Sequence, residues 1–288
     1  MKWFMTTNES SLGNKSFFKL LQVAVVSAQK NTRLIPHLVY DGTEKPRELK
    51  WLKDRGVTIV PFHSPLREPI AEFVRQSAAS DLVDVRTGAY LKTEIPEAIK
   101  QYGLNDKYVL YTDCDVVFVK DFDLRKAEPR FLSAFGQKEG GRTRFHFGGW
   151  IHYNTGVMLF NVDAMHEETG RFRDFVLENG RGIRRPNSQF WHKNLFLSDQ
   201  VAVNLFYRRM IDWLQELYNW NPLRGINKKA VVIHFNGLKW SQWEDFLESR
   251  LTPPRMEKFT RLIKANRPAF EYYVSLAQSY LDEVKSLD

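Results

Sequence analysis

The sequence predicts an α/β protein whose mostly parallel sheet is flanked by helices. Short apolar strands alternate with helical segments over residues 1–120, and this alternation is typical of parallel strands joined by right-handed crossovers. The segment KYVLYT, residues 107–112, is rich in Val, Leu and Tyr, as expected of a strand buried on both faces. A length of 288 residues, 43% of them hydrophobic, suits one large domain or a domain with a small appendage.

The first predicted elements follow one another closely. An apolar strand at 3–6 precedes a helix that begins after the cap residue Asn14, because apolar residues recur there at helical spacing. Residues 35–42 indicate a strand ending in a turn, residues 44–56 a short helix closed by glycine, and residues 57–62 another strand. In sheets of this kind, ligands bind beyond the carboxyl ends of the strands.

The later elements are less regularly spaced. Residues 130–135 and 155–162 are typical of strands, and residues 197–210 indicate a helix opened by a Ser-Asp cap. Residues 229–240 predict a strand that runs into a turn. Beyond the Pro-Pro pair near the end, apolar residues recur at helical spacing, which predicts a C-terminal helical extension over residues 246–288.

Composition narrows the compartment and the partners. The single cysteine, Cys114, excludes an internal disulfide, and no basic stretch with an apolar segment precedes MKWFMTTNESS, so we expect a cytoplasmic protein. The net charge of +8 favours anionic partners: nucleotide phosphates, an anionic membrane surface or nucleic acid. The net charge alone does not distinguish among these partners. The content of 14% aromatic residues, including 8 Trp, indicates side chains on which sugar or base rings can stack.

Two aspartates, Asp113 and Asp115, stand one residue apart at the end of the strand over residues 108–112. One interpretation is a strand end with two turn-forming residues. However, residues i and i+2 of an extended chain project from the same face, and two close carboxylates ionise together only beside a cation. Oxygen donors suit Mg²⁺ or Mn²⁺ carrying phosphate oxygens. The pair therefore predicts a metal site for a phosphorylated ligand.

A histidine and a lysine extend this hypothesis. His234 ends the predicted strand AVVIH, and as a third ligand its imidazole would favour Mn²⁺ over Mg²⁺. Lys239 follows the turn glycine Gly237 and would supply positive charge to a phosphate. The alternatives are a structural histidine and a solvated surface lysine.

Two other motifs are rejected. Residues 136–143, GQKEGGRT, nearly match a phosphate-binding loop, but Arg142 replaces its lysine and no amphipathic helix follows. The aspartate pair also resembles the nucleophile loop of haloacid-dehalogenase-type phosphatases, but the paired acidic loop of that family is missing from the sequence.

Four stretches together resemble a known family. LYTDCDVVF (110–118), YNTGVMLFNV (153–162), SDQVAVNLF (198–206) and VVIHFNGLKW (231–240) occur in the order found in the family 8 glycosyltransferases, which include glycogenin-like and lipopolysaccharide galactosyltransferase-like enzymes. The resemblance covers residues 1–245 and implies a GT-A fold, a Rossmann-like nucleotide-sugar domain. It also implies transfer of glucose or galactose, with retention, from a UDP-sugar to a saccharide, glycolipid or protein acceptor.

The resemblance implies a role for each matching residue. Asp113, Asp115 and His234 match the ligands of Mn²⁺, with Mg²⁺ as the alternative ion, and Gly237 and Lys239 match the diphosphate-binding turn. That turn is one residue shorter here than in the family and lacks its proline.

The remaining matches concern the sugar and the nucleotide. Asp199 matches a residue that binds hydroxyls of the transferred sugar, and Gln200 one that lies near the anomeric carbon. Three further matches lie near the donor sugar: Asn154, Thr155 and Gly156. Lys92 stands where the family usually has arginine. Three residues match the nucleotide loop: Thr6, Asn8 and Ser10. Of these, Asn8 and Ser10 replace the more typical Asp and Asn.

Retention allows two routes: front-face attack with Gln200 steadying the reacting centre, which we favour, or double displacement with Asp199 as nucleophile.

Two aromatic loops predict an acceptor site with Trp150 or Trp191 stacking on a sugar. We expect the basic C-terminal helices either to pack on the domain or to contact a membrane peripherally. No nucleic-acid partner is expected. The alternatives to a transferase are an inactive nucleotide-sugar-binding protein and a metal-dependent phosphatase.

Overall fold

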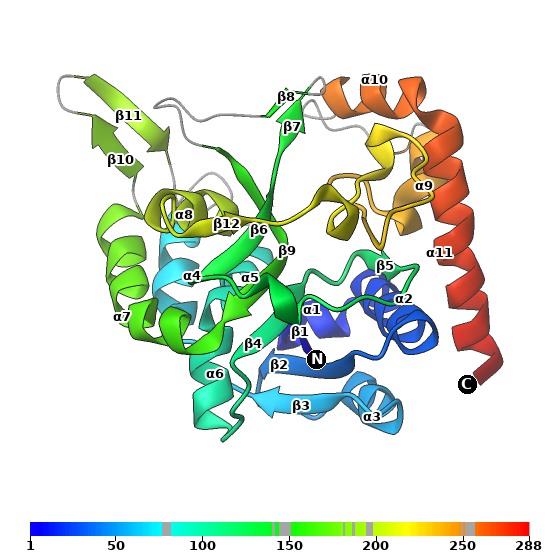
Figure 1. Ribbon diagram of the computed structural model, residues 1–288. Helices are drawn as coiled ribbons and strands as arrows, with labels where there is room; N and C mark the ends of the chain where they lie inside the picture. Colours follow the sequence, from blue (N-terminus) through cyan, green and yellow to red (C-terminus); the bar gives the residue numbers. More distant parts are fainter. Residues whose placement is uncertain are drawn as a thin grey trace. The chain divides into compact units, whose positions relative to one another are not determined.

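The computed structural model in Figure 1 forms two compact units. Unit 1 comprises Met1–Gly13, Ile35–Thr112 and Leu124–Leu214, and unit 2 comprises Asn14–Leu34, Asp113–Asp123 and Gln215–Asp288. The structure describes residues 1–76, 82–139, 142–143, 151–180, 182–185, 188–193, 198–248, 250 and 257–287.

Unit 1 is built on a mixed sheet of seven strands in the order β12-β6-β9-β4-β1-β2-β3. Every neighbouring pair is parallel except the two pairs made by β9, which runs antiparallel to both β4 and β6. The strands are β1 (Lys2–Asn8), β2 (Ile35–Asp41), β3 (Thr58–Pro61), β4 (Tyr108–Thr112), β6 (Leu132–Gly136), β9 (Tyr153–Asn161) and β12 (Ile211–Trp213). The predicted α/β fold with a mostly parallel mixed sheet is confirmed.

The helices of unit 1 cover this sheet. They are α1 (Glu9–Gly13), α3 (Arg47–Asp54), α4 (Arg67–Arg75), α5 (Val83–Tyr90), α6 (Ile95–Gln101), α7 (Val162–Asn179) and α8 (Asp199–Phe206), with 3-10 turns η2 (Leu91–Glu94) and η3 (Arg125–Ala127). Their apolar faces close a core around Phe4, Val109 and Phe160, which are at most 1% exposed. Burial of this apolar surface is the main stabilising term of the unit.

Two short ribbons occur in segments for which the sequence analysis predicted no strand. They are β7 (Lys138–Glu139) with β8 (Arg142–Thr143), and β10 (Gly182–Arg185) with β11 (Ser188–Lys193). Both pairs are antiparallel, and the β10–β11 register shifts twice within four residue pairs. The residues are Arg- and Gly-rich without apolar alternation, so no strand pattern is visible in the sequence.

Unit 2 combines long helices with a small ribbon. Its elements are α2 (Lys15–Asn31), β5 (Val116–Phe118), η5 (Glu216–Tyr218), η6 (Pro222–Arg224), β13 (Val232–His234), η7 (Trp240–Gln242), α9 (Trp243–Leu247), α10 (Glu257–Ala265) and α11 (Arg267–Leu287). Asn31 Nδ2 donates to the Phe118 carbonyl at 3.0 Å and to the Tyr280 hydroxyl at 2.6 Å, which links α2, β5 and α11. The predicted C-terminal helices are therefore present, and the domain boundary at residue 245 stays a prediction.

Helix ends follow the expected cap chemistry. The Asn14 side chain accepts from the backbone N–H groups of Ser16 and Phe17, at 2.9 and 3.1 Å, and so caps α2. The Ser198 hydroxyl accepts from Val201 N and caps α8. No helix in the described part of the chain is long and apolar enough to span a membrane.

Asn14→Ala is expected to destabilise the protein by about 1 kcal/mol, because two N–H groups at the start of α2 lose their acceptor. Denaturant unfolding of the variant and the parent measures this difference. Asn14→Ser is the matched control, since serine supplies another cap oxygen. Equal stability of the alanine variant and the parent would contradict the assigned cap.

Candidate functional site

Three potential metal ligands converge in unit 2. Asp113 and Asp115 stand between β4 and β5, and the antiparallel pairing of His234 with Val116 brings the histidine beside them. His234 Nε2 lies 3.4 Å from Asp115 Oδ1 and 3.7 Å from Asp113 Oδ2. One ligand atom of each residue lies within 4.8 Å of the others. Such a set of two carboxylates and one imidazole fits a divalent ion of the Mn²⁺ type.

Asp115 carries a buried charge that its neighbours compensate. Its side chain is only 6% exposed and forms an ion pair with the Lys239 ammonium. Burial raises the pKa of the Asp115 carboxyl, but the positive charges of Lys239 and His234 outweigh that effect and lower it overall. Gly237, at φ 104°, forms the turn that returns Lys239 to this carboxylate, although the turn is shorter than in the resembling family.

A residue not found by the sequence analysis, Asn219, fixes the orientation of the His234 ring. Asn219 Oδ1 lies 2.9 Å from His234 Nδ1, and both side chains are buried. An amide oxygen only accepts, so Nδ1 carries a proton and Nε2 is the nitrogen that faces the two aspartates. A ring held through Nδ1–H in this way would bind a metal through Nε2. No motif marks Asn219, because its role comes from one long-range contact.

A second asparagine, Asn221, holds the loop that follows the histidine. Asn221 Nδ2 donates to the Asn236 carbonyl at 3.0 Å, and its Oδ1 accepts from Leu223 N at 2.8 Å. Asn236 directly precedes Gly237, so this bond restrains the start of the predicted diphosphate turn.

The predicted sugar-binding residues gather in unit 1. Lys92 Nζ lies 2.9 Å from Asp199 Oδ2, and both side chains are nearly buried. The Thr155 hydroxyl lies 3.5 Å from the same carboxylate oxygen, and the Lys92 ammonium lies 5.2 Å from the centre of the Tyr111 ring. Lys92 therefore neutralises Asp199, as a buried carboxylate requires.

Gln200 is held by a small network of its own. Its Oε1 accepts from Asn154 Nδ2 at 3.2 Å and from Thr155 N at 3.3 Å, and its Nε2 lies 2.7 Å from His152 Nε2. Asn154 Oδ1 accepts from Gly156 N at 3.0 Å. The structure thus brings the predicted residues of this network together and shows His152 as a further contact of Gln200. The roles of these residues toward a sugar stay predictions.

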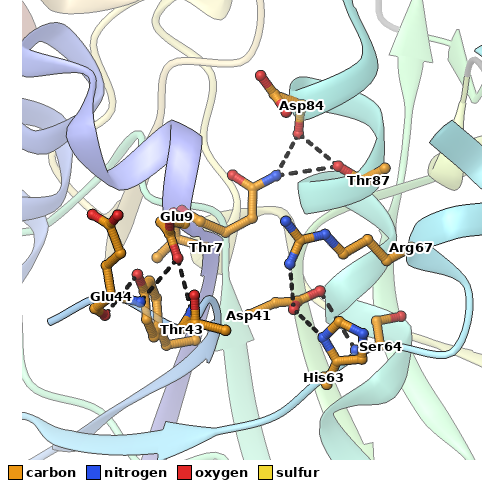
Figure 2. A network of polar contacts seen from close by, with 12 residues as sticks. Thr7, Glu9, Asp41, Thr43, Glu44, His63, Ser64, Arg67, Asp84 and Thr87 are labelled. Atoms are coloured by element: carbon orange, nitrogen blue, oxygen red, sulfur yellow. Dashed lines mark hydrogen bonds and ion pairs between the residues drawn. The ribbon is translucent and has the colours of Figure 1, made fainter. Parts of the chain in front are cut away.

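The predicted nucleotide loop lies at the end of β1, where Thr6 is buried in the strand. Asn8 Nδ2 donates to the Asp84 carbonyl at 2.7 Å and to the Thr87 hydroxyl at 3.2 Å (Figure 2), so local contacts use both amide hydrogens. The Ser10 hydroxyl donates to the Asp84 carboxylate at 2.7 Å. Contacts of these residues with a base stay predictions.

The predicted acceptor contacts cannot be placed in the same way. Trp150 lies outside the described residues, and of Trp191 only the backbone, in β11, is described. In the C-terminal extension, Arg261 and Lys264 are exposed and Ile263 is buried, so α10 presents an apolar residue inward and basic residues outward.

The fold agrees with that of solved glycosyltransferases. The chain is similar to galactosyltransferase LgtC, solved with donor and acceptor sugar analogs, with a TM-score of 0.55 and 16% identity over 90% of this chain and 99% of that one. It is similar to the glycosyltransferase GlyE of Streptococcus pneumoniae TIGR4, with a TM-score of 0.54 and 14% identity over 99% of this chain and 64% of that one. The chain is also similar to mouse xyloside xylosyltransferase 1, with a TM-score of 0.52 and 13% identity over 82% of this chain and 98% of that one.

Comparison by sequence adds nothing to this: neither a model of a protein family nor a curated protein matches the chain. The shared fold is therefore the GT-A glycosyltransferase fold, as the sequence motifs predicted.

Asn219→Ala is expected to weaken Mn²⁺ binding by about 10- to 100-fold, because the His234 ring loses the acceptor that fixes its tautomer. Calorimetric titration of Mn²⁺ without nucleotide measures the effect directly.

Two further variants control for this loss. Asn219→Asp keeps the acceptor and should retain more affinity than the alanine variant. Asn221→Ala disturbs the adjoining loop without touching His234, and should bind Mn²⁺ nearly as well as the parent. If Asn219→Ala bound Mn²⁺ as tightly as the parent while folded, the positioning role would be excluded.

Proposed function

We propose that the protein is a metal-dependent, retaining glycosyltransferase that transfers glucose or galactose from a UDP-sugar to a saccharide, glycolipid or protein acceptor. The observation that carries the proposal is the convergence of Asp113, Asp115 and His234 in a chain with the GT-A fold. A carboxylate pair faced by an imidazole nitrogen is suited to an ion that carries a diphosphate.

The charged residues have separate parts in this reaction. When bound, Mn²⁺ or Mg²⁺ supplies Lewis-acid stabilisation of the diphosphate leaving group. Lys239 is paired with Asp115 in the structure, and we propose that it moves to a diphosphate oxygen when an ion takes its place. Lys92 pairs with Asp199 and orients its carboxylate for hydrogen bonds from sugar hydroxyls.

The contacts of Asp199 favour front-face attack over double displacement. A carboxylate paired with an ammonium group at 2.9 Å has its nucleophilic charge partly neutralised. Gln200 is an amide and a poor nucleophile, but its three neighbours hold it rigidly enough to orient the reacting groups. An Asp199→Asn variant that retained most of the transfer rate would argue against a nucleophilic Asp199.

The acceptor and the compartment follow only from the resemblance and the surface. We propose a saccharide or glycolipid acceptor and a cytoplasmic enzyme. A peripheral contact of the basic face of α10, which includes Arg261 and Lys264, with an anionic membrane is the natural complement of a glycolipid acceptor.

UDP is expected to bind in the presence of Mn²⁺, and this binding should be lost when EDTA is added. Asp115→Ala should abolish the metal-dependent part of UDP binding. Calorimetry measures binding, and product analysis with UDP-glucose and UDP-galactose measures turnover. Asp121→Ala, an exposed aspartate in unit 2, is the control. Binding without turnover would favour an inactive nucleotide-sugar-binding protein, and absence of UDP binding under both conditions would refute the proposal.

Lys239→Gln is expected to raise the affinity for Mn²⁺ alone several-fold, because the ion no longer displaces an ammonium group from Asp115. The same variant should bind UDP with Mn²⁺ more weakly, because a positive charge beside the diphosphate is lost. Titrations of the ion and of the nucleotide, performed separately, test both signs. A parallel loss of both affinities would contradict the exchange of partners.

A further inference from the structure

A second polar cluster lies at the carboxyl edge of the parallel strands of unit 1. Asn8, the last residue of β1, is in register with Asp41, the last residue of β2, and β3 pairs alongside β2. We name Asp41, His63, Ser64 and Arg67 the Asp41 cluster. It lies at the strand ends where ligands of parallel sheets bind, and none of its members was selected by the sequence motifs.

The buried carboxylate of Asp41 organises this cluster. Asp41 Oδ1 accepts from Arg67 Nη1 at 3.0 Å and lies 3.1 Å from His63 Nδ1, while Oδ2 accepts from Ser64 N at 3.4 Å. The Asp41 side chain is 4% exposed, whereas that of Arg67 is 33% exposed and that of His63 is 71% exposed. Figure 2 shows Arg67 reaching from the start of α4 to Asp41. A fixed carboxylate therefore orients a cation that solvent still reaches.

Arg67 has unused hydrogen-bond donors at this edge. A guanidinium has five N–H groups, and within the described part of the chain the Arg67 guanidinium makes one hydrogen bond, to Asp41. Asn8, by contrast, uses both amide hydrogens on Asp84 and Thr87. Arg67 is therefore better suited than the Asn8 side chain to donate to a ligand in this region.

The surrounding charge selects the kind of ligand. The Glu9 carboxylate accepts from Thr43 N at 2.7 Å and from Glu44 N at 3.1 Å, and the Asp84 carboxylate accepts from Ser10. Figure 2 shows Glu9 and Asp84 in the same view as Asp41, each with its own hydrogen-bond partners. The Glu9 carboxylate interacts with the charge of Arg67, so a phosphate bound to Arg67 would be repelled by Glu9. A neutral group with a carbonyl oxygen would gain a charge-assisted hydrogen bond without that repulsion.

Building on the proposed function, we propose that Arg67, held by Asp41, binds the nucleobase of the donor by donating to a ring carbonyl oxygen. The ligand class is a nucleoside diphosphate whose base exposes a carbonyl, as uracil does. Adenine exposes an amino donor in place of a carbonyl and would face the guanidinium donors unfavourably. Asp41 is a positioning residue in this arrangement, since Arg67 makes the contact.

Calorimetry with Mn²⁺ present tests the proposal with three ligands: UDP, ADP and inorganic pyrophosphate. Arg67→Gln should lower UDP affinity about tenfold, the effect of one hydrogen bond to a charged group. Pyrophosphate affinity should not change, because that ligand has no base, and the preference for UDP over ADP should shrink. Arg75→Gln, at the other end of α4 and exposed, is the matched control and should behave like the parent.

The other outcomes overturn the proposal in distinguishable ways. Equal losses for UDP and pyrophosphate would show that Arg67 acts on phosphate or through the fold. Unchanged UDP affinity in Arg67→Gln, or equal affinity of the parent for UDP and ADP, would exclude base recognition by Arg67. A parent protein that binds pyrophosphate with Mn²⁺ but no nucleoside diphosphate would overturn the base subsite alone. Binding of none of the three ligands would refute the proposed function together with the subsite.

Discussion

The buried negative charge of Asp115 is the constraint on which the arrangement of unit 2 depends. A carboxylate that leaves water must find cations or donors nearby, or its burial costs several kcal/mol. Here the partners come from one returning segment: His234 at the end of β13 and Lys239 after the turn. The backbone continues the same contact, since Phe235 N donates to the Asp115 carbonyl at 3.0 Å. One charge thus joins two segments that are more than a hundred residues apart in the chain and keeps ligand atoms together before any ion binds.

Local chemistry explains why the first part of the fold was predictable. Strands β1, β2 and β3 and helices α2 and α3 follow from apolar periodicity, the Asn14 cap and the glycine stop at Gly56, which are signals within a few residues. The position of β9 between β4 and β6 was not predictable, because strand order depends on pairing between distant segments. Similarly, the helix expected over 197–210 ends at Phe206, where Tyr207 turns to pack against Phe172, a tertiary contact without a sequence signal.

The candidate site likewise contains residues that were predictable from the sequence and residues that were not. Asp113 and Asp115 were predicted from their spacing at a strand end, and His234 from its place at the end of another strand in a matching motif; the structure places the three together. Asn219 and Arg67 were missed because each is a single polar residue whose importance comes from one partner distant in sequence. The structure also shows what a motif does not: Asn8 occupies a nucleotide-loop position, yet its amide hydrogens serve the local fold. Position within a motif therefore predicts location better than it predicts which atoms remain for a ligand.

The ribbon of β5 and β13 has only three residue pairs, the last of which sets His234 opposite Val116. Side chains alternate between the faces of a strand, so a single inserted or deleted residue within β13 would turn the imidazole to the opposite face. A change of length beyond Phe235 has no such effect, because the register is already fixed there. This boundary explains why a turn shortened by one residue is compatible with the site. The chain can therefore change length on the distal side of this histidine while the residues that would bind the metal keep their positions.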